Sequence, residues 1–517
     1  MSRWASPAVR QSSAAGKANL DDLIGLMIRE RVGSTYWGAQ PELPQPGYAL
    51  VSVRDSEARS RLLEKLPRQR RFYCVDQPDC DPWHLISGAS EVIADADDEL
   101  ALISAMAGLP VRCIGNGRFT DAGTEESRNA LIARHVLGLD YANPFTGVPM
   151  TPFEAVELSA SWRRLIDGNR QFDAIYGIAS WKRETLDALM WPGGDVPAFR
   201  STLRREAVRA AAIWRSRTPP KVVADLEHGG ADIIEIEDGF IRSAGLGADC
   251  IPPSSVVVDH LGIYFDPSRP NDLERILEEG SYPKSLRHRA RSLRELIVER
   301  GVTKYASGER PRVERRSAKR LILVPGQVED DRAVLEGGHG LTSNLELLRR
   351  VRERAPDAHI IYKPHPDVEA GHRRGSLHDH ATFAHADEVV RDQSISSLID
   401  LVDEVHVNTS LAGFEALMRL KPVTTYGVPF YAGWGLTTDL GAVPKRRTAR
   451  RTLDELVAAA LILYPRYLDP KSGLPCPPEI LVRRLAEGEP AGGSSALIWL
   501  RRLQGRLRRK LANVANG

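Results

Sequence analysis

The sequence predicts an α/β protein in which two halves, each built on a mainly parallel sheet, face each other across a cleft. The first observation is the alternation of short apolar runs with helical patterns of about 10–15 residues, which is typical of parallel sheets covered by helices on both faces. The second is that two polar motifs, Glu237-Asp238-Gly239 and Lys363-Pro364-His365-Pro366, each directly follow such a run. Because ligands of open α/β sheets bind at the ends of strands, the two motifs predict a ligand site in the cleft.

The expected strands are apolar runs that end in loops rich in glycine, proline or polar residues. In the first part of the chain they are residues 48–53, 72–75, 91–93 and 111–114. In the middle they are residues 172–176, 221–223, 231–236, 255–259 and 262–265. In the last part they are residues 320–325, 359–362, 404–407 and 423–426, with helices expected at 344–354 and 411–420.

Shifts of composition divide the chain into expected segments. They are a disordered start at 1–20, a degenerate α/β unit at 21–125, a helical linker at 126–170, α/β halves at 171–316 and 317–445, a helical segment at 446–490 and a basic amphipathic tail at 491–517. Residues 91–115 resemble residues 404–427, which indicates an internal repeat. The earlier copy is called degenerate because it has Asp97-Asp98 near the position where the later copy has Thr409-Ser410. No His-Pro motif precedes the early copy.

Composition narrows the class of protein. The 517 residues suffice for two or three domains, and 42% hydrophobic with 27% charged residues is ordinary for a soluble globular protein. No apolar run approaches the roughly 20 residues that span a bilayer. Residues 1–17 lack the apolar core of a secretory signal, and the five cysteines form no CxxC pair. We therefore expect a cytoplasmic protein.

Glu237-Asp238-Gly239 is the first candidate for chemistry. Adjacent side chains on a strand point to opposite faces, so one of the two carboxylates is expected to face the cleft. That carboxylate can deprotonate a hydroxyl or attack an anomeric carbon to form a covalent glycosyl intermediate. The alternative is an acidic strand end that caps a loop. The paired glycines of Gly245-Leu246-Gly247, just downstream, expose backbone N–H groups that suit an anion.

The second and third candidates favour phosphate. Prolines hold His365 extended at a strand end, where it and Lys363 can donate to a phosphate, although a rigid exposed turn is the alternative. Thr409 or Ser410 precedes the helix at 411–420 as an N-cap, and a helix start with spare hydroxyls also binds phosphate. Glu415, about one turn into that helix, is placed to reach a ribose or base.

A further acidic loop follows the strand at 320–325. Here Gln327 leads to Glu329, Asp330 and Asp331, which either supply a general acid or cap the next element. The histidines of residues 372–385 have no recognised zinc spacing, so no metal is expected.

The tail at 491–517 combines leucines at helical spacing with arginine and lysine on the other face. Leu500, Leu503, Leu507 and Leu511 form the apolar stripe. Such a helix suits an anionic membrane surface, and packing of the stripe on the protein body is the alternative. Nucleic-acid binding is not expected, because the basic residues are confined to this short tail and no recognition motif is present.

Taken together, these motifs resemble the bacterial capsule polysaccharide biosynthesis family of the KpsC/LipB type, the β-Kdo glycosyltransferases. The resemblance runs from about residue 177 to residue 476. The blocks that carry it are residues 237–243, 245–247, 262–267, 325–331, 362–366, 409–415 and 429–435, in this order.

The resemblance implies a GT-B-like pair of Rossmann domains, an acceptor-side one at 171–316 and a CMP-binding one at 317–445. It implies CMP-Kdo as donor, no cofactor, and transfer of β-Kdo with retained configuration onto a lipid-linked oligo-Kdo primer. Asp238 would be the nucleophile, ahead of Glu237, with Glu329, Asp330 and Asp331 as further acids of the site. The donor-side residues would be Lys363, His365, Pro366, Thr409, Ser410, Glu415 and Gln327, and the sugar or acceptor contacts Arg242, Ser243 and Tyr431.

The resemblance also implies partners and leaves alternatives. The partners are the lipid-linked acceptor, an anionic inner-membrane surface reached through the tail, and capsule assembly and export proteins. Many members of the family carry two complete transferase modules, whereas the first module here is shortened, so we expect one activity. The alternatives are another GT-B enzyme, such as a nucleotide-sugar epimerase or a polyol-phosphate transferase, or a non-catalytic capsule-assembly scaffold.

Overall fold

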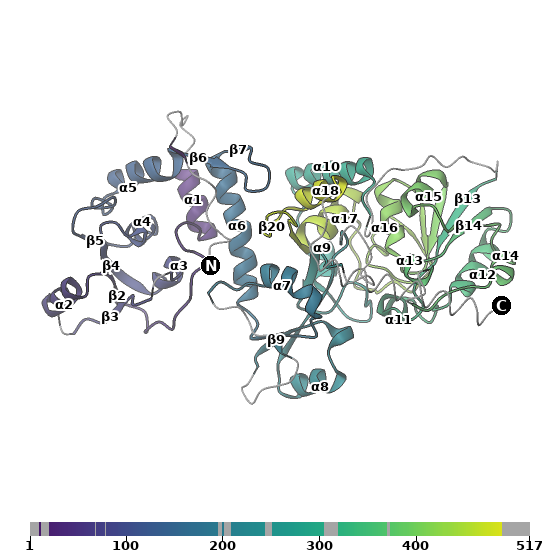
Figure 1. Ribbon diagram of the computed structural model, residues 1–517, viewed down its shortest axis with the longest axis horizontal. Coiled ribbons are helices and arrows are strands. Elements are labelled where there is room, and N and C mark those ends of the chain that lie inside the picture. The colour runs from purple at the N-terminus through teal and green to yellow at the C-terminus, as the bar shows by residue number, and fades with distance from the viewer. Residues whose placement is uncertain are drawn as a thin grey trace. The chain divides into compact units, whose positions relative to one another are not determined.

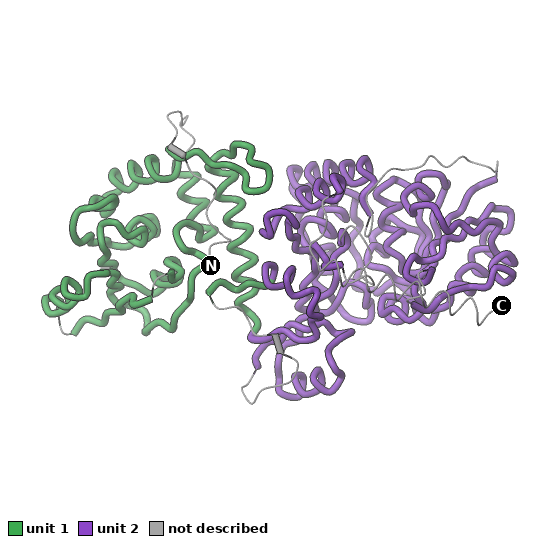
Figure 2. The backbone as a smooth tube through the Cα atoms, in the orientation of Figure 1, with its two compact units in different colours: residues 1–172, 190–198 green, residues 173–189, 199–517 purple. Residues whose placement is uncertain are grey.

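The structure is a computed structural model that describes residues 10–11, 20–67, 69–77, 79–194, 199–200, 208–242, 251–303, 319–369 and 373–488. The chain forms two compact units, coloured separately in Figure 2. Unit 1 comprises Met1–Phe172 and Met190–Ala198, and unit 2 comprises Asp173–Leu189 and Phe199–Gly517. No helix of the described residues is both long enough and apolar enough to cross a membrane.

Unit 1 contains a four-stranded parallel sheet in the order β3-β2-β4-β5. Its strands are β2 (Tyr48–Ser52), β3 (Phe72–Cys74), β4 (Ala89–Asp95) and β5 (Val111–Ile114), and β1 (Arg10–Gln11), β6 (Leu139–Ala142) and β7 (Pro149–Met150) form a small separate sheet. Its helices are α1 (Leu20–Glu30), α2 (Ser56–Lys65), α3 (Pro82–Leu85), α4 (Glu99–Met106), α5 (Glu125–Ile132) and α6 (Pro152–Asn169) (Figure 1).

The first sheet of unit 2 has seven strands in the order β20-β19-β12-β11-β10-β8-β9. They are β8 (Ala174–Tyr176), β9 (Phe199–Arg200), β10 (Ala210–Ile213), β11 (Asp232–Asp238), β12 (Ser255–Asp259), β19 (Pro465–Leu468) and β20 (Pro475–Cys476). The strands from β9 to β11 are parallel, whereas β12, β19 and β20 run antiparallel to their neighbours. Around them lie α7 (Arg183–Leu189), α8 (Pro220–His228), α9 (Asp272–Glu279) and α10 (Lys284–Arg300).

The second sheet of unit 2 is parallel throughout, in the order β15-β14-β13-β16-β17-β18. Its strands are β13 (Leu321–Pro325), β14 (His359–Lys363), β15 (Glu388–Val389), β16 (Glu404–Val407), β17 (Val423–Thr425) and β18 (Thr438–Asp439). Its helices are α11 (Arg332–Gly337), α12 (Asn344–Arg354), α13 (Pro366–Glu369), α14 (Asp379–Phe383), α15 (Ile395–Leu401) and α16 (Leu411–Met418), followed by α17 (Leu453–Val457) and α18 (Pro478–Ala486). The α/β fold with two Rossmann-like domains of GT-B type is therefore as predicted.

Four local expectations differ from the structure. The segment 126–170 is not only a helical linker, since it contains β6 and β7 and belongs to unit 1. Residues 221–223 lie in α8 rather than in a strand, because Pro220 sits at the first turn, where proline starts a helix. Residues 262–265 form no strand. The segment 446–490 is not only helical, since it returns to the first sheet and adds β19 and β20 to it. Arg446 and Arg447 also bind Glu274 of α9, the latter through Nε to Oε2 at 2.8 Å.

The internal repeat predicted from the sequence has a structural counterpart. In unit 1 the strand order β3-β2-β4-β5 repeats, element for element, the order β14-β13-β16-β17 of unit 2. In both copies a parallel strand pair encloses one helix, α4 in the first and α16 in the second. The N-cap of that helix is Asp98 in the first copy and Ser410 in the second. An acidic cap replaces a hydroxyl cap, so the two copies offer different groups at the same strand edge.

Unit 2 has two halves, the first built on the seven-stranded sheet and the second on the six-stranded sheet. The two halves share one hydrophobic core. Phe240, two residues beyond β11, packs against Phe430 with ring centroids 4.6 Å apart and lies 6.3 Å from Phe414 of α16. All three rings are buried. Gly239, just before Phe240, is required by packing, since a Cβ there would come within 2.3 Å of Ser255 Oγ. The aromatic contact fixes the end of β11 relative to the second half of the unit.

Candidate functional site

A cleft of about 860 Å³ lies between the two halves of unit 2. From the first half its lining comes from the carboxyl ends of β8, β10 and β11, and from the second half from those of β13 to β17. Polar and aromatic lining residues include Trp181, Lys182, Trp214, Arg217, Glu237, Asp238, Arg242, Gln327, Asp330, Asp331, Arg332, Lys363, His365, Asp367, Arg373, Gln393, Thr409, Ser410 and Glu415. This is the edge at which open parallel sheets bind ligands.

Asp238, the last residue of β11, is held between two cations. Lys182 Nζ donates to its Oδ1 at 3.0 Å, and Arg242 Nε donates to its Oδ2 at 2.8 Å. The Arg242 guanidinium also donates to the carbonyl of Ile251 at 2.8 Å, and this second hydrogen bond fixes the orientation of the guanidinium toward Asp238. Because both oxygens accept from a cation, the carboxylate stays ionised and fixed in the cleft.

Lys182 ends a short 3₁₀ turn, Ser180–Lys182, that follows β8. Its side chain is 5% exposed, and Nζ lies 3.2 Å from the ring centroid of Trp214, a cation–π contact. Burial lowers the pKa of Lys182, whereas the negative charges of Asp238 and Glu237 raise it. The charged form of Lys182 is therefore stabilised by the two carboxylates that face it.

Glu237 also lines the cleft, so the expectation that a single carboxylate of this motif faces it is wrong. The alternation of side chains holds inside a strand, but β11 ends at Asp238, where the backbone leaves the sheet. Glu237 Oε1 accepts from the Asp238 backbone N–H at 3.0 Å. Two carboxylates are thus available on this side of the cleft.

On the opposite side, the Lys-Pro-His-Pro motif joins β14 to α13. His365 caps α13, with Nδ1 accepting from the backbone N–H of Asp367 at 3.1 Å. A neutral His365 therefore carries its proton on Nε2, which can donate to a ligand. Lys363 is 8% exposed, and its Nζ donates to the carbonyl of Arg391 at 2.7 Å. Burial lowers the pKa of Lys363, and the nearby Glu369 and Asp392 oppose that change.

Gln327 fastens the start of α16 to the loop after β13. Its Oε1 accepts from the Thr409 backbone N–H at 2.9 Å, and its Nε2 donates to Thr409 Oγ1 at 3.0 Å. Ser410 is the N-cap of α16 and accepts from Ala412 N at 3.2 Å. Glu415, one turn further, is 6% exposed and lines the cleft. The structure therefore brings these donor-side residues together.

Two residues that the sequence placed in the site, Tyr431 and Glu329, do not line the cleft. Tyr431, expected to contact a sugar, is 0% exposed, and its hydroxyl donates to the Ser410 carbonyl from behind the cleft. Glu329, expected among the acids of the site, is absent from the lining, because its Oε1 accepts from Asn344 N at 2.8 Å, where it caps α12. Asp331 lines the cleft but also caps α11, accepting from Ala333 N at 3.0 Å. Asp330 also lines the cleft, and its Oδ1 accepts from Arg373 Nη2 at 3.3 Å.

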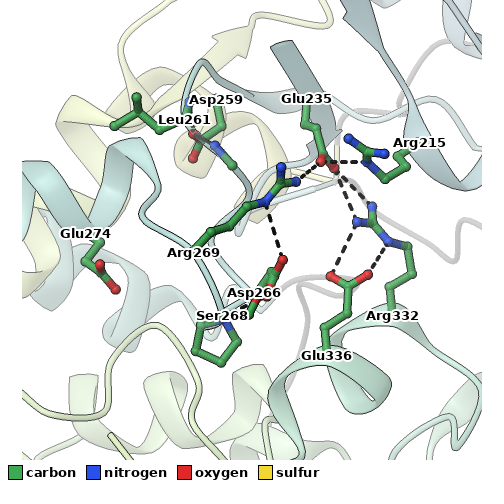
Figure 3. Close-up of polar contacts among 12 residues, drawn as sticks. Arg215, Glu235, Asp259, Leu261, Asp266, Ser268, Arg269, Glu274, Arg332 and Glu336 are labelled. Atoms are coloured by element: carbon green, nitrogen blue, oxygen red, sulfur yellow. Dashed lines mark hydrogen bonds and ion pairs between the residues drawn. The ribbon is translucent and has the colours of Figure 1, made fainter. Parts of the chain in front are cut away.

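The buried carboxylate of Glu235 links the two halves of unit 2 through Arg332, which lines the cleft (Figure 3). Glu235 Oε1 accepts from Arg215 Nε at 2.7 Å and from Arg269, and Oε2 accepts from Arg332 Nη1 at 3.2 Å. Arg332 begins α11 and also binds Glu336 through Nε at 2.9 Å. Burial raises the pKa of Glu336, and Arg332 counteracts this. The cluster joins β11 of the first half to α11 of the second.

Several expectations lie outside the described residues: Ser243, the Gly245-Leu246-Gly247 loop, His372 and the tail at 491–517. Within the part of the chain that is described, no three His, Cys, Asp or Glu side chains are grouped as metal ligands would be.

Sequence reasoning missed Lys182, Trp214, Arg217, Arg332 and Arg373. The available signal was position, since Lys182 follows the strand ending at Tyr176, and Trp214 and Arg217 follow the strand that ends at Ile213.

Comparison with known proteins identifies the family. The family model described as capsule polysaccharide biosynthesis protein matches residues 210–304 and 280–467. The lipopolysaccharide-processing protein LpsZ of Rhizobium meliloti is 44% identical over 375 residues, which are 67% of this chain and 85% of LpsZ. The chain belongs to the capsule polysaccharide biosynthesis family, in agreement with the resemblance noted in the sequence.

Two further relatives bear on the fold and length. The capsule polysaccharide modification protein LipA of Neisseria meningitidis serogroup A is 34% identical over 438 residues, 79% of this chain. The alignment spans only 61% of LipA's own length. Among solved structures, the Thermosulfurimonas dismutans KpsC β-Kdo 2,4 transferase is 31% identical, with a TM-score of 0.54, covering 61% of this chain and 98% of that one.

Proposed function

We propose that this protein is a capsule-related glycosyltransferase that transfers β-Kdo from CMP-Kdo to a lipid-linked Kdo primer. The observation that carries the proposal is that Asp238 lies between two cations on one wall of the cleft, with Lys363, His365 and the start of α16 on the other. A carboxylate suits an anomeric carbon, and the opposite groups suit a nucleotide phosphate. The similarity to a β-Kdo transferase supports the sugar.

In the proposed reaction Asp238 attacks the anomeric carbon of Kdo, and CMP leaves with the electron pair of the broken C–O bond. An acceptor hydroxyl then displaces Asp238 from the same carbon, so two inversions retain the configuration. Glu237, on the same wall as Asp238, takes the proton of the acceptor hydroxyl. Asp330 and Asp331 lie on the other wall and are second candidates for this proton transfer.

The leaving group is stabilised from the second half. The Nε2–H of His365 and the ammonium of Lys363 donate to the single phosphate of CMP, and the Ser410 hydroxyl at the start of α16 adds a further donor. Glu415 accepts from the ribose or the base. We expect these groups to serve without a cofactor, since one phosphate carries less charge than the diphosphate of many sugar donors.

The acceptor and location belong to the same proposal. A lipid-linked acceptor places the enzyme on the inner face of the membrane, and the basic amphipathic tail at 491–517 would bind anionic lipid there. Capsule assembly and export proteins are the expected partners. Unit 1 lacks the Glu-Asp-Gly and Lys-Pro-His-Pro motifs, so one transferase activity is proposed for the chain.

The test is incubation with a synthetic Kdo-lipid acceptor and CMP-Kdo generated in situ, followed by mass and linkage analysis. We expect addition of β-linked Kdo, and loss of both transfer and CMP release in Asp238→Ala. Glu329→Gln is the matched control, because this carboxylate caps α12 and does not line the cleft. Absence of transfer to every acceptor length would refute the proposal. Transfer that survives in a folded Asp238→Ala variant would remove Asp238 from the mechanism.

A further inference from the structure

The two cations around Asp238 are more than a nucleophile requires. A carboxylate in a wet cleft is ionised at neutral pH without help, yet here both of its oxygens accept from buried cations. Resting on the function proposed above, we propose that Lys182 and Arg242 select donors that carry a carboxylate on the anomeric carbon itself. These two side chains are then the residues that distinguish the donor proposed above from a neutral sugar.

The negative charge on Asp238 is lost in the first step of the proposed reaction. One oxygen of Asp238 forms a bond to the anomeric carbon, and the bond from that carbon to the phosphate oxygen breaks. The electron pair of the broken bond leaves with CMP, and Asp238 becomes a neutral ester. Lys182 and Arg242 then face one negative charge fewer than before, although neither cation has moved.

A buried cation that loses its partner is strongly disfavoured, because few water molecules can replace the lost anion. The side chains of Lys182 and Arg242 are 5% and 1% exposed, so neither can turn to bulk solvent. In a 2-ulosonic acid, a carboxylate is attached to the same carbon as the new ester oxygen. It therefore arrives beside both cations as the charge of Asp238 disappears. A neutral sugar brings no such replacement.

The side chains of Lys182 and Arg242 are fixed in position before the carboxylate of the donor sugar binds. The ammonium of Lys182 rests on the face of Trp214, with the ring centroid 3.2 Å from Nζ and the ring of Trp181 5.1 Å away. Arg242 is anchored on the carbonyl of Ile251. Fixed donors aimed at a place where charge changes stabilise it without reorganisation during the reaction. The geometry thus favours the covalent intermediate of one class of sugar.

The first experiment measures donor preference in the full-length protein. Release of CMP is compared for CMP-Kdo and for its C1-amide analogue, in wild type, Lys182→Met and Lys182→Arg. We expect wild type to prefer the carboxylate by about 10²-fold or more, as sites built around a charged partner do. Lys182→Met should lower this preference at least about tenfold, with Lys182→Arg in between. Inhibition by CMP should be equal in all three, because the proposed nucleotide contacts, Lys363, His365 and Ser410, lie on the other wall.

The outcomes separate the two proposals. If wild type releases no CMP from CMP-Kdo, the proposed function fails. If wild type is active and a folded Lys182→Met retains the full preference for the carboxylate, only the present inference fails. Thermal unfolding of each variant checks the fold, and Lys182→Arg, which keeps the charge, retains a test if the methionine variant is unstable.

The second experiment imitates the intermediate by charge alone. Asp238→Asn replaces the carboxylate with a neutral group of the same shape, as ester formation does. Free Kdo, added to protein saturated with CMP, should bind Asp238→Asn about tenfold or more tighter than wild type. The double variant with Lys182→Met should lose most of this gain, and the C1-amide of Kdo should show none. Equal binding of Kdo by wild type and Asp238→Asn would overturn the charge-replacement argument.

Discussion

The ion cluster around Glu235 makes a prediction about the joint between the two halves of unit 2. Glu235 is 2% exposed and accepts from three arginines, of which Arg332 belongs to the second half and Arg215 and Arg269 to the first. Glu235→Gln preserves the shape of the side chain and removes its charge. The three guanidinium groups would then face one another without the anion that holds them together.

The expected loss can be worked from the burial of the four groups. Breaking a buried ion pair by removing one partner costs about 3–5 kcal/mol. The side chains of Arg215, Arg269 and Arg332 are 26%, 41% and 21% exposed, so water replaces part of what they lose. We therefore expect the free energy of unfolding to fall by about 3 kcal/mol, at the lower end of that range. Because Arg332 directly follows the cleft residues Asp330 and Asp331, the KM for the donor should rise as well.

The measurement is urea unfolding followed by circular dichroism, with wild type and Glu235→Gln compared at neutral pH. Glu353→Gln is the matched control, since its carboxylate pairs with Arg349 on α12 and is 60% exposed, and such surface pairs contribute about 0–1 kcal/mol. A double-mutant cycle with Arg332→Met isolates the link between halves. A Glu235→Gln variant that is as stable as the control would refute the reasoning.

Three further predictions concern the cleft. His365→Phe should weaken inhibition by CMP about tenfold, since a hydrogen bond to a charged group contributes about 1.5–3 kcal/mol; an unchanged inhibition constant would exclude the Nε2–H as a phosphate donor. Burial lowers the pKa of Lys182, so its ammonium is lost as pH rises through a value below that of an ordinary lysine, and kcat/KM should fall there. Lys182→Arg, which stays protonated, should move that alkaline limb upward, whereas a limb that stays in place belongs to another group. Tyr431→Phe removes the hydrogen bond to the Ser410 carbonyl and should cost about 1 kcal/mol of stability with little change in KM; a large rise in acceptor KM would instead restore Tyr431 as a sugar contact.

Much of the fold was predictable because strands and their ends are local features. The runs at 320–325, 359–362, 404–407 and 423–426 became β13, β14, β16 and β17 with boundaries shifted by at most a residue or two. The expected strand at 221–223 was wrong for a local reason as well, since the strand preference of Val222 and Val223 is outweighed by the helix start that Pro220 creates. The two strands in 446–490 were not predicted for a different reason: β19 pairs with β12, which lies about two hundred residues earlier in the chain, and β20 pairs in turn with β19.

In the candidate site, too, some residues could be predicted from local sequence and others could not. His365, Lys363, Thr409 and Ser410 follow strand ends that are visible in the sequence, and all line the cleft. Glu329 and Tyr431 were misplaced, because a motif shows which residues are neighbours in the chain but not which way each side chain turns. Glu329 turns to a helix start, and Tyr431 supports the cleft from behind.

The α/β class, most of the strands that line the cleft and the strand ends that carry Asp238 and His365 could be read from the sequence alone. These follow from apolar periodicity and from prolines and glycines, which act within a few residues. The surroundings of Asp238 could not be read in this way, since Lys182 is 56 residues away in the chain and reaches it across parallel strands that lie side by side. Charge balance depends on distance in space, and folding sets that distance.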